Sequence, residues 1–386
     1  MCLAGRVAWI YTGIGVEMSI ETGAGTRGPA EYERGLEEGS GSVASFEAAG
    51  KTPLRRLQHF LHSYPTMIPF IVLLLGILLF SVLVGARFFT PFNLSLILQQ
   101  VTIIGIIGIA QTLIVLTAGI DLSVGAIMVL SSVVMGRMAV ISGVPYELTF
   151  VLGLLCGLAC GAVNGWLVSY VKLPPFIVTL GTWLIFGALN LAYSQSETIR
   201  QQDIAAVAPF LQFTGGLALD FDRSWPLIGG ARITNGAVLM VLLAGLVWYM
   251  LNRTAFGRHI HATGDDAEAA RLAGIRTSRT LVAVYALAGL ICAIGGWALI
   301  GRIGSISPQA GQTANLDSIT AVVIGGTSLF GGRGSIVGTL VGALIVGVFR
   351  NGLALYGVDV LWQEFAVGCL IILAVAIDQW IRRVSA

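Results

Sequence analysis

Residues 257–275 read GRHIHATGDDAEAARLAGI, a short polar and charged segment that separates two long apolar runs, at about 236–252 and 280–301. An apolar run of roughly 20 residues is long enough to cross the hydrocarbon core of a bilayer as a helix. The segment is therefore expected to join two membrane spans. Because it is too short to bury a core of its own, we expect it to dock onto a partner at the membrane surface.

The same segment carries the signals of one short helix, at about 265–273. Asp265 stands at the position of an N-cap, and Glu268 follows three residues later in the spacing of a capping box. Arg271 suits the last turn, and Gly274 suits the residue at which the chain leaves the helix. The helix would carry one apolar stripe, formed by residues three and four positions apart: Ala269, Leu272 and Ala273.

The composition of the whole chain is that of a membrane protein. Hydrophobic residues make up 56% of it and charged residues only 11%, with a mean hydropathy of +0.86. These values exclude a soluble globular domain. The net charge of +2 argues against nucleic acid as a partner. Four of the five cysteines lie inside apolar runs, without the spacing of a disulfide framework or a metal site, so we expect no bound metal.

The distribution of apolar residues predicts an all-α fold, a polytopic helical membrane protein with about ten transmembrane helices over residues 66–386. Glycine and proline interrupt the hydropathy near 95–141 and 316–350, where a broken or re-entrant helix would give the same pattern. Residues 1–65 form an N-terminal tail without periodic apolar positions, which we expect to be largely disordered. The apolar runs lie at about 68–86, 95–117, 122–141, 148–170, 176–193, 236–252, 280–301, 316–330, 335–350 and 361–381.

Basic residues in short loops predict the orientation, because they stay on the cytoplasmic side of the membrane. With ten spans, the basic clusters of alternate loops fall on one side, together with both termini. We therefore expect the N and C termini and the loop 253–279 to be cytoplasmic, and the long loop 194–234 to be periplasmic. The basic residues on the cytoplasmic side include Lys51, Arg55, Arg56, Lys172, Arg253, Arg258, Arg271, Arg276, Arg279 and Arg333.

Polar residues within the spans are candidates for a solute path, since each is costly in hydrocarbon. Asp121 lies at an expected break between two spans, where it could cap the following helix or take part in the path. The uncharged candidates suit a neutral, hydroxylated solute, although helix packing or an interfacial belt would explain any one of them alone. They are Gln111, Asn164, Phe176, Thr179, Thr182, Trp183 and Asn190.

The chain lacks the residues that would let it supply energy itself. The glycine-rich segment 325–333 has neither the lysine nor the following serine or threonine of a phosphate-binding loop, so the chain is not expected to bind ATP. An ion-driven carrier would need charged side chains in mid-span, and these positions read as neutral. No catalytic group stands out either, so we expect no enzyme and no cofactor.

Four segments in order, 116–125, 173–182, 257–275 and 323–334, resemble the permease subunits of bacterial ABC sugar importers of the ribose, xylose and fructose type, and are most similar to fructose import permeases. The resemblance implies a permease homodimer in the inner membrane, two cytoplasmic ATPase subunits that bind the ATP, and a periplasmic sugar-binding protein. It implies transport of a monosaccharide, fructose or else ribose or mannose. The coupling residues it implies, within a Glu-Ala-Ala-x-x-x-Gly pattern, are Gly264, Asp265, Glu268, Ala269, Ala270 and Gly274.

Several other functions stay open. The related ABC permeases for nucleosides or branched-chain amino acids share a distant likeness, and an ion-coupled secondary sugar carrier would need no ATPase. An intramembrane transferase would need paired carboxylates at a membrane face, and the pair Asp265 and Asp266 stands at a helix start instead. The sequence also departs from the family pattern here, since the family often has Gly-Asn where this chain has two aspartates.

Overall fold

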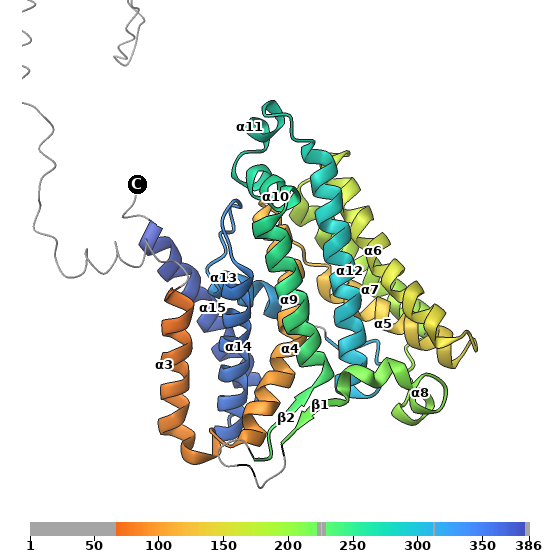
Figure 1. Ribbon diagram of the computed structural model, residues 1–386, viewed down its shortest axis with the longest axis vertical. Coiled ribbons are helices and arrows are strands. Elements are labelled where there is room, and N and C mark those ends of the chain that lie inside the picture. The colour runs from red at the N-terminus through yellow and green to blue at the C-terminus, as the bar shows by residue number, and fades with distance from the viewer. Residues whose placement is uncertain (1–66, 222–224, 226–228, 312, 383–386) are drawn as a thin grey trace, which may run out of the picture. The chain divides into compact units, whose positions relative to one another are not determined.

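A computed structural model describes residues 67–221, 225, 229–311 and 313–382 (Figure 1). The predicted tail over 1–65 lies outside the described residues. Seven of the described helices are long and apolar enough to cross a membrane, and three shorter apolar helices accompany them. These helices match the ten predicted apolar runs one for one. The prediction of a polytopic helical membrane protein is confirmed.

The helices alternate in direction through one helical domain (Figure 1). The long spans are α3 (Met67–Val84), α4 (Pro91–Leu116), α6 (Tyr146–Ser169), α7 (Pro175–Ser194), α9 (Asn235–Arg253), α12 (Thr277–Ile303) and α14 (Ile336–Tyr356). The other apolar helices are α5 (Val124–Val140), α13 (Ala314–Ile324) and α15 (Val360–Arg382). The connecting elements are η2 (Gly85–Arg87), α8 (Gln201–Val207), η3 (Pro209–Gly215), β1 (Leu217–Asp220), β2 (Arg232–Thr234), α10 (Ala255–Asp265) and α11 (Ala267–Leu272).

One of the predicted spans is shorter than expected, at a place where its glycines indicated a possible break. The helix predicted over 316–330 is α13, which has only 11 residues and ends at Ile324. A helix of that length rises about 16 Å and cannot cross a hydrocarbon core of about 30 Å. The glycines that follow turn the chain instead, with positive φ at Gly326, Gly331 and Gly332. The prediction of a full span was wrong here, because the glycine-rich turn shares the high hydropathy of the helix before it.

Helices α4 and α12 form the buried centre of the domain, and α3, α6, α7 and α9 present apolar side chains outwards. Four glycines of α6 spaced four residues apart face inwards, and Gly157 and Gly161 lie against the backbone of α12. A Cβ at Gly161 would overlap the carbonyl oxygen of Tyr285. These four glycines therefore form a packing seam, since close backbone contact replaces the hydrophobic driving force inside a bilayer.

The polar segments gather at the two ends of the helical domain. Figure 1 shows α10 and α11 at one end, and the β1–β2 hairpin with α8 at the other. The two strands pair antiparallel. Helix α4 begins at the hairpin end, where the Ser95 hydroxyl accepts a hydrogen bond from the Arg232 backbone N–H at 2.8 Å. Its other end, Leu116, reaches the level of α10.

Candidate functional site

The segment 253–279 folds as two helices rather than one, with the break at Asp266. Helix α10 runs on through Asp265, so the prediction that Asp265 caps the second helix was wrong. The Asp266 carboxylate caps α11, accepting hydrogen bonds from the backbone N–H groups of Glu268 at 2.9 Å and Ala269 at 3.0 Å. Glu268 is consequently the second residue of the helix, and there is no capping box.

The end of α11 follows the sequence prediction. Arg271 lies in the last turn and forms an exposed ion pair with Glu268 at 3.5 Å. Gly274 has a φ of +87°, the left-handed conformation that ends many helices. The Ile275 N–H then donates to the Ala270 carbonyl at 3.0 Å, which closes the turn. Of the predicted coupling residues, only Gly264 and Ala270 are buried within the chain.

The apolar stripe of α11 is exposed within the described part of the chain. The side chain of Leu272 is 83% exposed, and Ala269 and Ala273 are exposed beside it. Leu272 and the two alanines therefore leave an apolar stripe open to a partner protein.

Helix α10 is attached to the membrane helices through the glycine-rich turn after α13. The His261 ring nitrogen Nδ1 lies 2.9 Å from the Gly332 carbonyl oxygen, and the Gly332 N–H donates to the Leu116 carbonyl at 3.0 Å. Gly264 packs directly on Leu116, where a Cβ would overlap the carbonyl oxygen. A movement of α10 would therefore reach the end of α4 without an intervening flexible loop.

The turn that follows α4 is held by the polar candidates of the neighbouring helices. The Asp121 carboxylate accepts hydrogen bonds from both the N–H and the hydroxyl of Ser123, each at 2.6 Å. The Asn164 amide donates to the Ser123 hydroxyl at 2.8 Å. Thr179 donates to the Ile120 carbonyl at 3.0 Å. Asp121 does not cap α5, since Ser123 is the N-cap residue, so that prediction was wrong.

Gln111 completes this network from α4. With its amide nitrogen turned towards Asp121, it donates to the Asp121 carbonyl at 3.0 Å and accepts from the Asp121 N–H at 3.3 Å. Four of the candidate path residues thus bond to one turn, which we call the α4–α5 turn (residues 117–123). Together they hold the turn in place, and none of the four lines the cavity described next.

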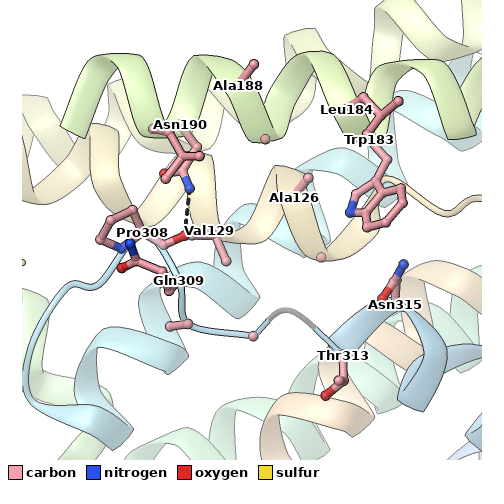
Figure 2. Close-up of a pocket in the computed structure, with 15 residues that line it drawn as sticks. Ala126, Val129, Trp183, Leu184, Ala188, Asn190, Pro308, Gln309, Thr313 and Asn315 are labelled. Atoms are coloured by element: carbon pink, nitrogen blue, oxygen red, sulfur yellow. Dashed lines mark hydrogen bonds between the residues drawn. The ribbon is translucent and has the colours of Figure 1, made fainter. Parts of the chain in front are cut away.

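A cavity of about 680 Å³ lies between α5, α7 and the segment that leads into α13 (Figure 2). Its wall is mostly apolar with a few polar groups, as in small-molecule sites. Trp183 and Asn190 of α7, both predicted, line it. The Asn190 amide donates to the Pro308 carbonyl at 2.8 Å and so ties α7 to the opposite wall. The polar side chains on that wall, which the sequence did not indicate, are Gln309, Thr313 and Asn315.

The remaining two candidates lie apart from the cavity. Thr182 is buried and donates at 3.4 Å to the Thr179 carbonyl of its own helix. Phe176 is 50% exposed at the start of α7.

Asn315 joins the cavity to the α4–α5 turn, because its amide donates to the Leu122 carbonyl at 3.2 Å. The sequence held one signal for the missed wall. The run 304–313 is polar, and the apolar run after it is too short to span a bilayer, which is how a segment that re-enters the membrane looks.

No group of three or more metal-ligating side chains comes together within the described ranges. Nothing in the geometry of these residues assembles a nucleophile with a base either, and the polar groups serve backbone positioning and the cavity wall.

Comparison with known proteins identifies the family of this chain. A family model described as branched-chain amino acid transport system, permease component, matches residues 93–375. A fructose import permease of Rhizobium meliloti is 58% identical over 366 residues, which cover 95% of this chain and 99% of the relative. A ribose import permease of Bacillus subtilis is 40% identical over 311 residues, 81% of this chain and 92% of the relative.

A xylose transport system permease of Escherichia coli is 35% identical over 340 residues, which cover 76% of this chain and 86% of the relative. No solved structure matches. The family consists of transport permeases rather than enzymes, and its model covers the described helices from α4 into α15. The chain therefore belongs to this family of membrane-spanning permease components.

Proposed function

We propose that this chain is the inner-membrane permease subunit of an ABC importer that moves a monosaccharide, with fructose as the first candidate. The observation that carries the proposal is the 58% identity to a fructose import permease along almost the full length of both chains. The ribose and xylose permeases support the wider class of pentoses and hexoses. Two cytoplasmic ATPase subunits, a periplasmic sugar-binding protein and a second copy of the permease would complete the transporter.

In this proposal α11 is the part that the ATPase holds, and its exposed stripe is the contact surface. Closing and opening of the ATPase pair would move α10 and α11 as one body, a rigid-body change of the kind that couples sites in other proteins. The contacts from His261 through Gly332 to Leu116 would carry the shift to the α4–α5 turn. Asn315 would then carry it to the cavity wall.

The cavity between α5 and α7 is proposed as part of the solute path. Trp183 offers a ring face to the apolar side of a sugar, and the amide and hydroxyl groups of Asn190, Gln309 and Thr313 suit its hydroxyls. Under the predicted orientation, α10 and α11 face the cytoplasm, and the β1–β2 hairpin faces the periplasm. The outward apolar faces of α3, α6 and α9 would contact lipid.

Uptake measurements test the substrate. In a strain that lacks its own sugar importers, the complete importer should accumulate labelled fructose, and an excess of unlabelled ribose or mannose should compete if those sugars share the path. Labelled leucine and adenosine test the alternative permease functions. Accumulation of either of these without any sugar uptake would contradict the proposal.

One substitution tests the proposed contact surface. Leu272→Asp should reduce uptake about tenfold or more, because it places a charge in the ATPase contact. The loss of a central interface residue usually has an effect of this size. The same change should leave the amount of chain in the membrane unaltered, since the side chain is 83% exposed. Leu272→Met is the matched control and should transport normally. Normal uptake by the aspartate variant would argue against docking through α11.

A further inference from the structure

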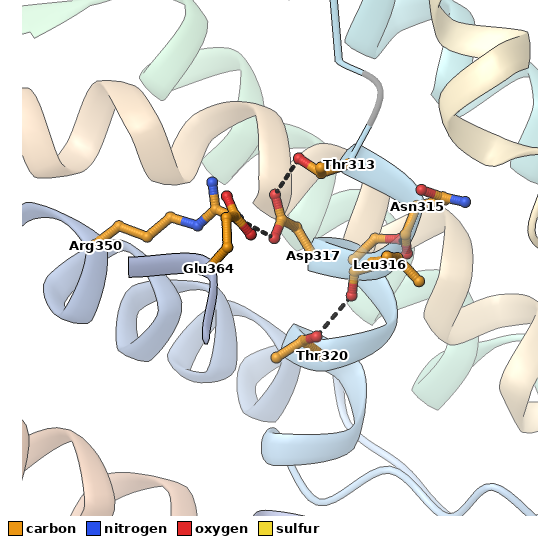
Figure 3. Close-up of polar contacts among 8 residues, drawn as sticks. Thr313, Asn315, Leu316, Asp317, Thr320, Arg350 and Glu364 are labelled. Atoms are coloured by element: carbon orange, nitrogen blue, oxygen red, sulfur yellow. Dashed lines mark hydrogen bonds and ion pairs between the residues drawn. The ribbon is translucent and has the colours of Figure 1, made fainter. Parts of the chain in front are cut away.

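Three charged side chains meet inside the helical domain, and none of them is among the candidate path residues. The carboxylate oxygen Oδ1 of Asp317, on α13, accepts a hydrogen bond from Arg350 Nη2, on α14, at 2.8 Å. The same nitrogen lies 3.0 Å from the Glu364 carboxylate, on α15. Figure 3 shows Arg350 and Glu364 together on one side of α13, with Asp317 directed towards them. We call this group the ionic triad.

Asp317 is 6% exposed, and the side chain of Arg350 is 24% exposed. Buried ion pairs contribute little net stability because desolvation opposes the attraction between the charges. Ionisable groups at membrane depth are consequently rare, and those that occur are candidates for function. A packing role alone would be met as well by apolar side chains of the same size.

The position of Asp317 in α13 suggests what the charge does. The first turn of α13 is also a wall of the cavity, since Thr313 and Asn315 line it. Figure 3 shows Asn315 and Asp317 leaving opposite sides of that turn. Asn315 attaches one side to the Leu122 carbonyl at 3.2 Å, and Asp317 attaches the other side to Arg350.

Asp317 also reaches the cavity lining directly. Its second oxygen, Oδ2, accepts a hydrogen bond from the Thr313 hydroxyl at 3.5 Å, and its backbone N–H donates to the Thr313 carbonyl at 3.0 Å. Helix α13 has only 11 residues, so its first turn has no long helix to hold it in place. Two side-chain contacts, one to the α4–α5 turn and one to α14, therefore fix this wall.

We propose that Asp317 is a positioning residue for the cavity, held by Arg350, and that it fixes the wall formed by Thr313 and Asn315. The inference rests on the proposed function for its meaning in transport, but its geometry does not depend on which solute passes. Arg350 supplies the positive charge that pairs with the Asp317 carboxylate. Glu364 is the outer partner of Arg350, since its side chain is 45% exposed.

The charges predict an order among the variants. Asp317→Asn keeps an acceptor for Thr313 and leaves Arg350 paired with Glu364, so it should be mild. Asp317→Ala removes the contact with Thr313 as well as the contact with Arg350. Arg350→Gln leaves two carboxylates facing each other without a cation and should lower the amount of chain in the membrane. The double variant Asp317→Asn with Arg350→Gln should restore that amount, because one unpaired carboxylate is removed. The cavity wall would still lack its ion pair to Arg350.

Thiol labelling of the cavity wall tests the proposal without any transport. A Gln309→Cys reporter is placed in the complete chain, whose five native cysteines are replaced by alanine, and the purified protein reacts with a water-soluble maleimide. We expect Asp317→Ala to change the labelling rate about tenfold. A change of this size corresponds to the loss of one charge-assisted hydrogen bond. The double variant should show the same altered rate, and Asp317→Asn should stay close to the parent.

Thr320→Val is the matched control, because Thr320 is also buried on α13 but bonds only to the Leu316 carbonyl of its own helix, at 2.6 Å. It should label like the parent. The proposal is overturned if Asp317→Ala labels at the parent rate, or if Thr320→Val alters the rate as much. If Asp317→Ala does not accumulate in the membrane, the double variant replaces it in the test. A parent-like labelling rate of the double variant then overturns the proposal.

Uptake by the complete importer then separates this inference from the proposed function. If the parent transports sugar, Asp317→Ala should transport far less and Asp317→Asn should recover most of the rate. If the parent transports no sugar, the proposed substrate is wrong, and the labelling rates still decide whether Asp317 fixes the wall.

Discussion

Asp266 illustrates how one residue sets the geometry of the exposed end of the chain. It ends α10 and caps α11, and it turns the backbone so that Leu272 points away from the domain. Asp265 and Asp266 are adjacent and have the same capping preference. Which of them caps α11 depends on where α10 ends. Sequence reasoning therefore found the short helix and its glycine end, and placed the cap one residue too early.

A substitution at the cap tests its role. Asp266→Ala should destabilise α11 by about 1 kcal/mol, because two backbone N–H groups lose their acceptor. Sugar uptake should fall several-fold, at an unchanged amount of chain in the membrane. Asp266→Asn is the control, since asparagine caps helices as well as aspartate does. Equal uptake by the alanine and asparagine variants would show that the cap does not matter for coupling.

At the scale of the elements, the seam between α6 and α12 depends on glycine. Gly161→Ala would place a Cβ on the Tyr285 carbonyl oxygen, and the two helices would have to separate. We expect a loss of about 1–3 kcal/mol, the usual result of overpacking, seen as a lower melting temperature of the detergent-purified chain.

The control for the seam is Gly245→Ala on α9, where no atom lies within 4 Å of the new Cβ. This change should leave the melting temperature unaltered or raise it slightly, because alanine favours a helix over glycine. If both variants melt alike, close backbone contact does not hold the seam.

The helices could be predicted from the sequence, and most of the cavity wall could not. Ten apolar runs predicted ten helices, because hydropathy and span length follow directly from bilayer thickness. The path residues were harder to predict, because a polar side chain in a span can equally serve a neighbouring backbone. Gln111 and Thr179 do so, and Trp183 and Asn190 line the cavity instead. The wall of the cavity, including Thr313, was missed because it lies in a segment that reads as an ordinary loop.

For the whole molecule, the predicted orientation is open to a direct test. A protease site inserted at the exposed Leu219, in β1, should be cut from the periplasmic side of intact cells, and one inserted after Leu272 should be cut only in inverted vesicles. The two sites lie at opposite ends of the helical domain, so the same side cannot hold both. Cleavage with the reverse pattern would contradict the assignment of cytoplasmic termini.

The central claim is that energy enters this molecule through α11, supplied by an ATPase partner, and not through its own charged groups. The purified chain is placed in liposomes, and sugar accumulation is measured with a proton or sodium gradient, and again with the ATPase, the binding protein and ATP. The account predicts accumulation only in the second case, and none when Leu272→Asp is used. Gradient-driven accumulation by the chain alone, which would give the ionic triad a role in ion coupling, would contradict it.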